Sequence, residues 1–430
     1  MYERKRDFIF NPGDNINLRK KMQTKDFGER LKGLGFSDFI GVPCSYLAPL
    51  INWAINENAF IMANNEGEAV AMASGISLSS LCDKTRRYGV VLMQNSRLSN
   101  ALSPLTSLNH TFEIPILGFV SLRGEPNEQG QNTDEPQHEL LGRITDKLLK
   151  ICEVECAFLD SQFEVACEQL TRAKKVLESN KSFFFIVRNN CFEKVALINN
   201  PLNLNLKNPS SQEFASVDFF EREQESQKPT RLQALQIIQN LSKDCAIFAT
   251  TGKCGRELYE LGDKANQLYM VGSMGCVSAL GLGVALKSNK KIIAIDGDSA
   301  LLMRLGALSG NGYYAKVANK GNFCHILLDN QSHDSTGGQF NLAPFVNFAQ
   351  VAKACEYSTI KVARNLSEFT AFLQEFLKAK NGGAWFIYLQ IANGSKKNLG
   401  RPKSAPKQVA LRFSAWLNES IVNFFFFTIF

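Results

Sequence analysis

Residues 290–339 have the sequence KKIIAIDGDSALLMRLGALSGNGYYAKVANKGNFCHILLDNQSHDSTGGQ, and this stretch decides the fold class. It contains two short apolar runs, 292–295 and 323–328, each rich in branched side chains and followed by polar residues. Runs of this length and composition are typical of strands buried in a parallel sheet. Ligands of open α/β sheets bind beyond the carboxyl ends of the strands, so we expect the polar residues after both runs at one crevice.

The polar residues that follow the two runs are suited to a metal ion and phosphate groups. They are Asp-Gly-Asp-Ser at 296–299 and Asp-Asn-Gln-Ser at 329–332. Carboxylate, amide and backbone carbonyl oxygens are the ligands that Mg²⁺ prefers. A helix expected to begin at Ser299 would present its N-terminus to an anion. The stretch therefore predicts a site for Mg²⁺ and the diphosphate that it neutralises.

The rest of the chain repeats the alternation of strands and helices on both sides of one polar segment. We expect strands at 38–42, 60–63, 89–93, 114–122, 155–159 and 182–187, and then at 246–250, 268–271, 292–295, 323–328 and 385–391. We expect helices at 26–34, 69–75, 232–241, 274–287, 345–357 and 366–378. This alternation predicts two doubly wound α/β domains with parallel sheets. The expected division is a polar leader 1–25, a domain 26–198, a linker 199–229, a domain 230–417 and an apolar tail 418–430.

Two local patterns support the helix assignments. The run 69–75 consists mainly of small residues, which suits a helix packed closely against a neighbour. Thr230 and Gln233 have the spacing of a capping box at the head of the helix 232–241.

Composition narrows the class of protein. The chain has 430 residues and a formal charge of +7, and the basic residues gather near the start and at 396–412. Because no aromatic residues are interleaved with a basic stripe, we expect no nucleic-acid partner. The eleven cysteines form no C-x-x-C pair, which favours reduced thiols and a cytoplasmic location. The N-terminus has no apolar signal segment and the tail is too short to span a bilayer, so we expect no membrane partner.

The motifs now in view resemble those of thiamine-diphosphate enzymes. Gly297-Asp298-Ser299 followed by Asn330 is similar to their metal-diphosphate motif, and Glu66 with its neighbours is similar to their cofactor-activating element. Longer runs, covering about 28–417, resemble the phosphonopyruvate decarboxylase family. They are GVPCS (41–45), MQNSRLSNALSPLTSL (93–108), RGEP (123–126), DEPQH (134–138), ATTGKCGRELY (249–259), YMVGSMGCVSALGLG (269–283) and LLDNQSHDSTGGQ (327–339).

This resemblance implies a fold, a reaction and a partner. It implies a pyrimidine-binding domain at 26–198 and a domain binding diphosphate and Mg²⁺ at 230–417, with the active site formed between subunits by self-association. The cofactors implied are thiamine diphosphate and Mg²⁺. The reaction implied is the non-oxidative decarboxylation of 3-phosphonopyruvate to phosphonoacetaldehyde and CO₂, a step of phosphonate biosynthesis. The substrate is then a 2-keto acid with an anionic phosphonate group.

The resemblance also implies roles for individual residues. Glu66 would activate the cofactor through its aminopyrimidine ring, and Met274 would hold the cofactor bent. Mg²⁺ would be held by Asp298, Asn330 and the carbonyl of Ser332. Further cofactor contacts would be Thr250, Thr251, Gly252, Gly272, Ser273, Gly297 and Ser299. Each motif also has a plain alternative, since Glu66 could be an acid favoured in a first helical turn and Asp298 a helix cap.

Substrate recognition needs cations, hydroxyls or free N–H groups for an anion. The candidates within the motifs are Ser45, Gln94, Asn95, Arg97, Arg123, Ser335 and Thr336. His138 and His333 are the candidates for proton transfer, because imidazole titrates near neutral pH, although either could merely close a loop.

The chain departs from the family pattern at a few positions. Cys44, Arg97 and Ser99 replace residues common in the family, and Ser299 replaces a glycine. The spacing between Asp298 and Asn330 is longer than usual, and we expect the excess to be looped out around 314–322. Sulfopyruvate decarboxylation, a thiamine-dependent carboligase reaction and a non-catalytic binding function remain alternatives.

Overall fold

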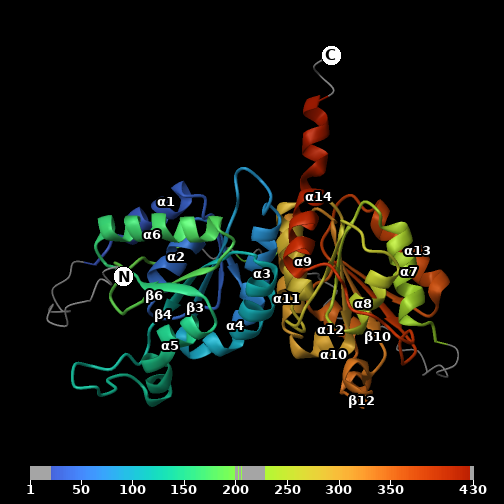
Figure 1. Cartoon of the computed structure of the whole chain (residues 1–430), viewed down its shortest axis with the longest axis horizontal. Helices are drawn as coiled ribbons and strands as arrows, with labels where there is room; N and C mark the ends of the chain where they lie inside the picture. Colours follow the sequence, from blue (N-terminus) through green and yellow to red (C-terminus); the bar gives the residue numbers. More distant parts are fainter. Residues whose placement is uncertain (1–20, 199–201, 203–204, 206–227, 427–430) are drawn as a thin grey trace, which may run out of the picture.

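The computed structural model describes residues 21–198, 202, 205 and 228–426, and it consists of two α/β domains side by side (Figure 1). The first domain contains the strands β1 (Asp38–Gly41), β2 (Phe60–Met62), β3 (Gly89–Gln94), β4 (Leu117–Ser121), β5 (Glu155–Phe158) and β6 (Phe183–Val187). Its helices are α1 (Thr24–Gly33), α2 (Ala48–Asn56), α3 (Glu66–Leu78), α4 (Leu98–Pro104), α5 (Glu139–Ile151) and α6 (Phe163–Glu178). Short helical turns lie at η2 (Asn95–Arg97), η3 (Leu105–His110) and η4 (Pro136–His138).

The second domain contains the strands β7 (Ala246–Ala249), β8 (Gln267–Tyr269), β9 (Ile292–Gly297), β10 (Phe323–Asp329), β13 (Thr359–Ala363) and β14 (Trp385–Gln390). A separate small hairpin pairs β11 (Ser332–His333) with β12 (Gln339–Phe340). The helices are α7 (Arg231–Leu241), α8 (Lys253–Glu260), α9 (Val277–Lys287), α10 (Asp298–Met303), α11 (Ala307–Ala318), α12 (Phe348–Ala354), α13 (Leu366–Lys378) and α14 (Pro406–Phe426). Two turns, η8 (Asp334–Thr336) and η9 (Ala343–Phe345), complete the domain.

Both large sheets are parallel, with strand orders β2-β1-β3-β4-β6-β5 and β13-β14-β10-β9-β7-β8. The prediction of two parallel-sheet α/β domains is confirmed. In the second sheet Leu328 pairs with Gly297, so the residues that follow β9 and β10 reach the same edge. The chain connections reverse direction between the neighbouring strands β7 and β9, since β7 leads on to β8 on one side while β9 leads on to β10 on the other. This is the position at which open α/β sheets bind ligands.

The structure differs from the expected elements at several places. The helix expected from 274 begins at Val277, because Gly272, Ser273 and Gly275 have positive φ angles of 64°, 47° and 82°. The segment expected to loop out around 314–322 is helical as far as Ala318, where α11 ends. The expectation of a loop was therefore wrong for 314–318, whereas 319–322 do lie between α11 and β10.

Some elements were missed or were shorter than expected. Strand β13 was missed, since it is an edge strand and only partly buried. The helix expected at 345–357 is confined to Phe348–Ala354. The capping box of Thr230 and Gln233 is confirmed.

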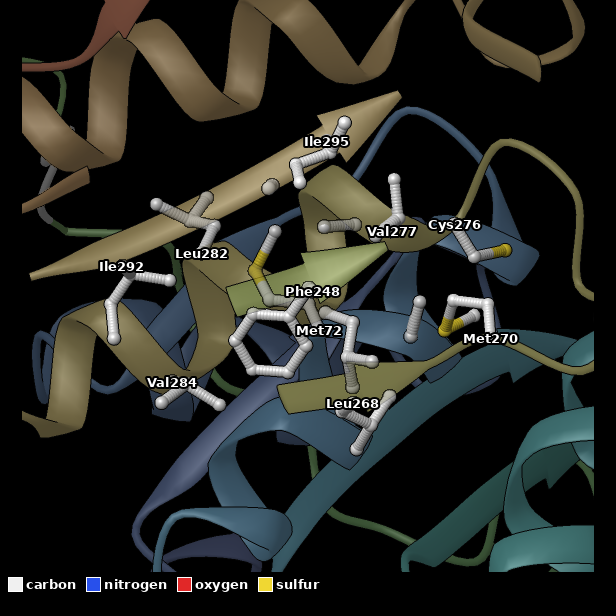
Figure 2. Packing of buried hydrophobic residues seen from close by; sticks show 14 of the residues in the cluster. Met72, Phe248, Leu268, Met270, Cys276, Val277, Leu282, Val284, Ile292 and Ile295 are labelled. Atoms are coloured by element: carbon white, nitrogen blue, oxygen red, sulfur yellow. The ribbon is translucent and has the colours of Figure 1, made fainter. Parts of the chain in front are cut away.

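Helices α3 and α9 join the two domains, and they lie next to each other at the centre of the molecule (Figure 1). A Cβ atom at Gly75 would collide with the carbonyl oxygen of Leu280, and a Cβ at Gly283 would collide with that of Met72. The helices therefore touch through their backbones. Figure 2 shows Met72 of α3 among buried side chains of the second domain, including Phe248, and these belong to one hydrophobic cluster.

The structure describes more of the C-terminal end of the chain than of the N-terminal end. Residues 1–20, most of the predicted linker and 427–430 lie outside the described residues, as do the side chains beyond residue 419. Helix α14 packs on the second sheet through Phe413, whose ring centroid is 4.9 Å from that of Phe248, and its last turns extend away from the domain (Figure 1). In the part of the chain that the structure describes, no helix has the length and apolar character needed to cross a membrane.

We expect Gly283→Ala to lower the free energy of unfolding by about 1–3 kcal/mol, because the added methyl group forces α3 and α9 apart. Urea denaturation measures this. The matched control is Gly33→Ala at the end of α1, where an added Cβ has no atom within 4 Å. Equal stability of the two variants would show that the helices do not need this close approach.

Candidate active site

A cavity of 320 Å³ lies at the carboxyl edge of the second sheet. Among the residues predicted from the sequence, its lining includes Thr250, Thr251, Gly252, Met274, Gly297, Asp298, Ser299, Asn330, Ser332, His333, Ser335 and Thr336. Asp296, expected at this crevice, also lines it, as do Arg231, Lys253 and Asp334, which were not predicted. The described residues that line this cavity all come from the second domain.

Three oxygen-bearing groups converge at the floor of the cavity. The end of the Asn330 carboxamide lies 3.0 Å from Oδ1 of Asp298 and 3.1 Å from the carbonyl oxygen of Ser332. With its nitrogen turned inward, the amide donates to both; with its oxygen turned inward, three oxygens face one another and require a cation between them. The donor set therefore fits Mg²⁺.

Burial and the side chain of Asn341, which was not predicted, set the environment of the Asp298 carboxyl group. Asp298 is the first residue of α10 and is buried, and this burial raises the pKa of its carboxyl group. The side chain of Asn341 donates hydrogen bonds to Oδ2 of Asp298 at 2.5 Å and to Oγ of Ser299 at 2.7 Å. Burial also raises the pKa of Asp329 to about 6. A cation bound here would offset the cost of burying these carboxylates.

Two helix starts that line the cavity suit phosphate groups. Gly252 has a φ of 90° and precedes α8, and Gly297 precedes α10. The first turns of both helices line the cavity, so their free N–H groups are available to an anion. Thr250 and Thr251 add hydroxyl groups at the end of β7.

Glu66 begins α3 and is only 1% exposed. Its Oε2 accepts a hydrogen bond of 3.0 Å from Nδ2 of Asn100, while Oε1 is buried without a hydrogen-bond partner among the described residues. Nη1 of Arg97 lies 3.9 Å from Oε1. A buried carboxylate oxygen with no partner is costly, so it marks a position at which a ligand would be favoured.

The loop 272–275 lies between the cavity and the first domain. Met274 lines the cavity, while Oγ of Ser273 lies 2.6 Å from Oγ of Ser107 in the first domain. Just beyond the loop, Sγ of Cys276 lies 3.9 Å from the carbonyl oxygen of Gly67, the residue after Glu66. Gly272 and Ser273 thus contact the first domain rather than line the cavity.

Residues 332–340, which we call the active-site hairpin, cover one side of the cavity. Oγ of Ser335 accepts a hydrogen bond of 3.3 Å from the backbone N–H of Lys253. The hydroxyl of Thr336 donates to the carbonyl oxygen of His333 at 3.1 Å. Both hydroxyls predicted as substrate contacts therefore also hold the hairpin in shape, and His333 faces the cavity beside them.

The remaining predicted residues gather at the carboxyl edge of the first sheet. Arg123 donates from Nε and Nη2 to the two carboxylate oxygens of Asp134, at 2.6 Å and 2.5 Å. This hydrogen-bonded pair lowers the pKa of Asp134 far below its ordinary value. Nη1 of Arg123 also donates to Oγ of Ser45 at 3.4 Å. The charge of Arg123 is therefore largely balanced within the protein.

Asn95 and His138 support the same region. Asn95 is buried, and its side chain binds both the N–H and the carbonyl of Arg123. Nε2 of His138 lies 3.3 Å from a carboxylate oxygen of Glu135. By contrast the side chain of Arg97 is 54% exposed, and Gln94 beside it donates to Ser96 at 2.5 Å. Of the two predicted arginines, Arg97 is the more available to an anion.

Sequence reasoning missed several residues of this site. Asn100 lies within one of the motifs quoted above and could have been found there. Asn341 and Arg231 carry no sequence signal, because their partners lie 43 and 103 residues away in the chain.

The sheet topology, the cavity and the convergent oxygen atoms define an α/β protein of the thiamine-diphosphate-binding class. The family described as "Thiamine pyrophosphate enzyme, C-terminal TPP binding domain" matches residues 251–388. A thiamine diphosphate-dependent 4-hydroxybenzoylformate decarboxylase from Rhodococcus jostii has the same fold, with a TM-score of 0.64 at 12% identity over 87% of this chain and 100% of that one.

The chain belongs to the phosphonopyruvate decarboxylase family. It is 37% identical to the phosphonopyruvate decarboxylase of Streptomyces viridochromogenes over 90% of this chain and 93% of that protein. Identity to the enzyme of Streptomyces hygroscopicus is also 37%, over 93% of this chain and 94% of that protein. A sulfopyruvate decarboxylase of Methanosarcina acetivorans is more distant, at 27% identity over 91% of this chain and 96% of that protein.

We expect Asp134→Asn to lower the free energy of unfolding by about 2 kcal/mol at pH 7, because it leaves the half-buried Arg123 guanidinium without its main partner. The folded-state pKa of Asp134 is depressed, so its stabilisation is complete above about pH 5 and declines as the pH falls below about 4. Urea denaturation at pH 7 and at steps down to about pH 2 measures this difference. Glu135→Gln is the control, since that side chain is 62% exposed and lies farther from Arg123; an equal loss in both variants would contradict the assignment.

Proposed function

We propose that the chain catalyses the non-oxidative decarboxylation of 3-phosphonopyruvate to phosphonoacetaldehyde and CO₂, dependent on thiamine diphosphate and Mg²⁺, in phosphonate biosynthesis. The observation that carries this proposal is the 37% identity to two phosphonopyruvate decarboxylases over nearly the whole chain. The lower identity to a sulfopyruvate decarboxylase of similar coverage favours the phosphonate substrate.

The second domain would hold the cofactor through its metal and its diphosphate. Asp298, Asn330 and the carbonyl of Ser332 would bind Mg²⁺, because their oxygens already converge. The diphosphate would lie against Gly252, Gly297 and Ser299, with hydroxyls from Thr250 and Thr251. When bound, thiamine diphosphate supplies the carbon nucleophile and the electron sink that decarboxylation requires.

Glu66 would hold a proton at Oε1 and share it with the aminopyrimidine ring of the cofactor. Its unpartnered, buried oxygen supports this role, because no hydrogen bond within the described residues competes for that proton. Asn100 orients the carboxyl group by donating to the other oxygen. The loop 272–275 would support the ring between the two domains, with Met274 as the apolar contact.

The anionic group of the substrate would be bound by Arg97, with polar support from Gln94 and Ser45. Arg123 would position this region rather than bind the anion alone, since Asp134 balances its charge. His333 is our choice for proton transfer to the product, because it lines the cavity whereas His138 faces Glu135.

We also propose that the chain self-associates, with the domain 26–198 of one copy completing the cofactor site in the domain 230–417 of another. Two features support this. The predicted substrate residues at the first sheet do not line the cavity of the second domain. Beside that cavity, the side chains of Phe340 and Phe345 are 86% and 85% exposed, which is unusual for large apolar residues. A cytoplasmic location is consistent with the cysteines, none of which is disulfide-bonded in the described residues.

A phosphonoacetaldehyde assay with the cofactor and Mg²⁺ added or withheld tests the function. We expect Asp298→Ala to abolish Mg²⁺-dependent cofactor binding, and Glu66→Gln to keep binding while turnover falls by about 10² or more. Glu139→Gln, at the first position of α5, is the control for a first-turn glutamate.

Unchanged turnover in Glu66→Gln would remove the proposed mechanism, and faster turnover of sulfopyruvate or of pyruvate would overturn the substrate assignment. Product analysis with an added aldehyde tests the carboligase alternative, because a carboligase would join the aldehyde to the decarboxylated substrate.

We expect His333→Asn to lower kcat by about 10², because it removes the proton donor that faces the cavity. His138→Asn should have a smaller effect, since that imidazole is directed at Glu135. Steady-state kinetics of both variants measures the difference. The reverse ranking would assign proton transfer to His138.

A further inference from the structure

A buried ion network joins the active-site hairpin to the body of the second domain. Arg231 is 8% exposed, and its Nε donates to Oε2 of Glu257 at 3.0 Å. Its Nη2 donates to Oδ2 of Asp334 at 3.0 Å and to the carbonyl oxygen of Gly394 at 3.1 Å. The side chains of Glu257 and Asp334 are 1% and 18% exposed.

Arg231 is fixed on the domain side of this network. It is the first residue of α7, directly after the Thr230 capping box, so its backbone is held by the helix start. Glu257 belongs to α8 and also accepts a hydrogen bond of 3.0 Å from the backbone N–H of Lys396. Two helices and the segment after β14 therefore hold the guanidinium, and Asp334 is the member of the network that belongs to the hairpin.

Asp334 lies between residues that face the cavity. His333 precedes it, and Ser335 follows it and accepts from the N–H of Lys253. Ser335 also fills the space that a Cβ at Gly252 would need. The hairpin is thus held at two consecutive residues, by an ion pair at Asp334 and by a neutral hydrogen bond at Ser335.

The network also neutralises a carboxylate at the cavity. Asp334 lines a cavity suited to anionic phosphate groups, where an unpaired carboxylate would oppose binding. Nε and Nη2 of Arg231 are committed to carboxylates and a carbonyl, so the guanidinium neutralises Asp334 instead of serving mainly as a phosphate ligand.

We propose that Arg231 is a positioning residue, which holds the active-site hairpin closed on the cofactor cavity through Asp334 and thereby fixes the His333 imidazole. The effect on turnover rests on the proposed function of His333, whereas the docking of the hairpin does not. Charge-assisted hydrogen bonds are stronger and more directional than neutral ones, which suits a contact that sets a side-chain position.

Hydrogen–deuterium exchange of Asp334→Asn in the full-length protein without added ligands tests the docking. This variant keeps the size of the side chain and leaves Arg231 paired with Glu257, whereas Arg231→Met would strand a buried carboxylate and could prevent folding. We expect amide exchange in residues 332–340 and at Lys253 to become about tenfold faster. In the assay described above, kcat should fall about tenfold with little change in KM.

Glu260→Gln is the matched control. Glu260 also lies on α8 and pairs with the side chain of Lys396 at 2.5 Å, yet among the described residues it forms no hydrogen bond or ion pair with the hairpin. We expect normal exchange and normal kcat in this variant. Unchanged exchange of the hairpin in Asp334→Asn, or an equal change in Glu260→Gln, would overturn the proposal. Faster exchange with unchanged kcat would overturn its catalytic part. If the wild-type protein were inactive but its hairpin still exchanged more slowly than that of Asp334→Asn, the proposed function would be refuted and the docking of the hairpin would stand.

Discussion

Parallel pairing of β9 with β10 is the constraint on which the candidate site depends. The register aligns Leu328 with Gly297, so Asp298 and Asn330 leave the sheet at the same edge. Neither residue alone would indicate a metal site, since an aspartate at a helix start and an asparagine after a strand are common. The backbone hydrogen bonds of the sheet bring their oxygens to within 3.0 Å, where only a cation or a rotated amide relieves their repulsion.

The contact between α3 and α9 has a comparable effect on the other half of the site. Glycines at 75 and 283 let the backbones touch, and this brings the first turn of α3 to the loop 272–275. Side chains at either position would separate the helices and move the first turn of α3 away from Cys276. The buried Oε1 of Glu66, which has no hydrogen-bond partner in the part of the chain that the structure describes, is thus positioned by packing that occurs well beyond the first turn of its helix.

Charge in the second domain is balanced pair by pair. Burial raises the pKa values of Asp298 and Asp329, which disfavours two nearby carboxylates unless a cation binds. Asp334, which lines the cavity together with Asp298, has its own internal cation in Arg231. The cavity can therefore offer oxygens suited to a cation and remain compatible with anionic groups.

The α/β class, the strands β9 and β10 and the capping box at Thr230 could be predicted from the sequence alone, because these depend on local periodicity and on turn residues. The sequence also located Glu66, Asp298 and Asn330, although their roles stay predictions. It missed β13, whose partly exposed edge position gives a weak pattern. Only the tertiary structure decided that Arg123 is paired with Asp134, that Asn341 supports Asp298 and that Arg231 reaches the hairpin. These contacts join residues up to 103 positions apart, and no local pattern specifies which distant side chains the folded sheets will bring together.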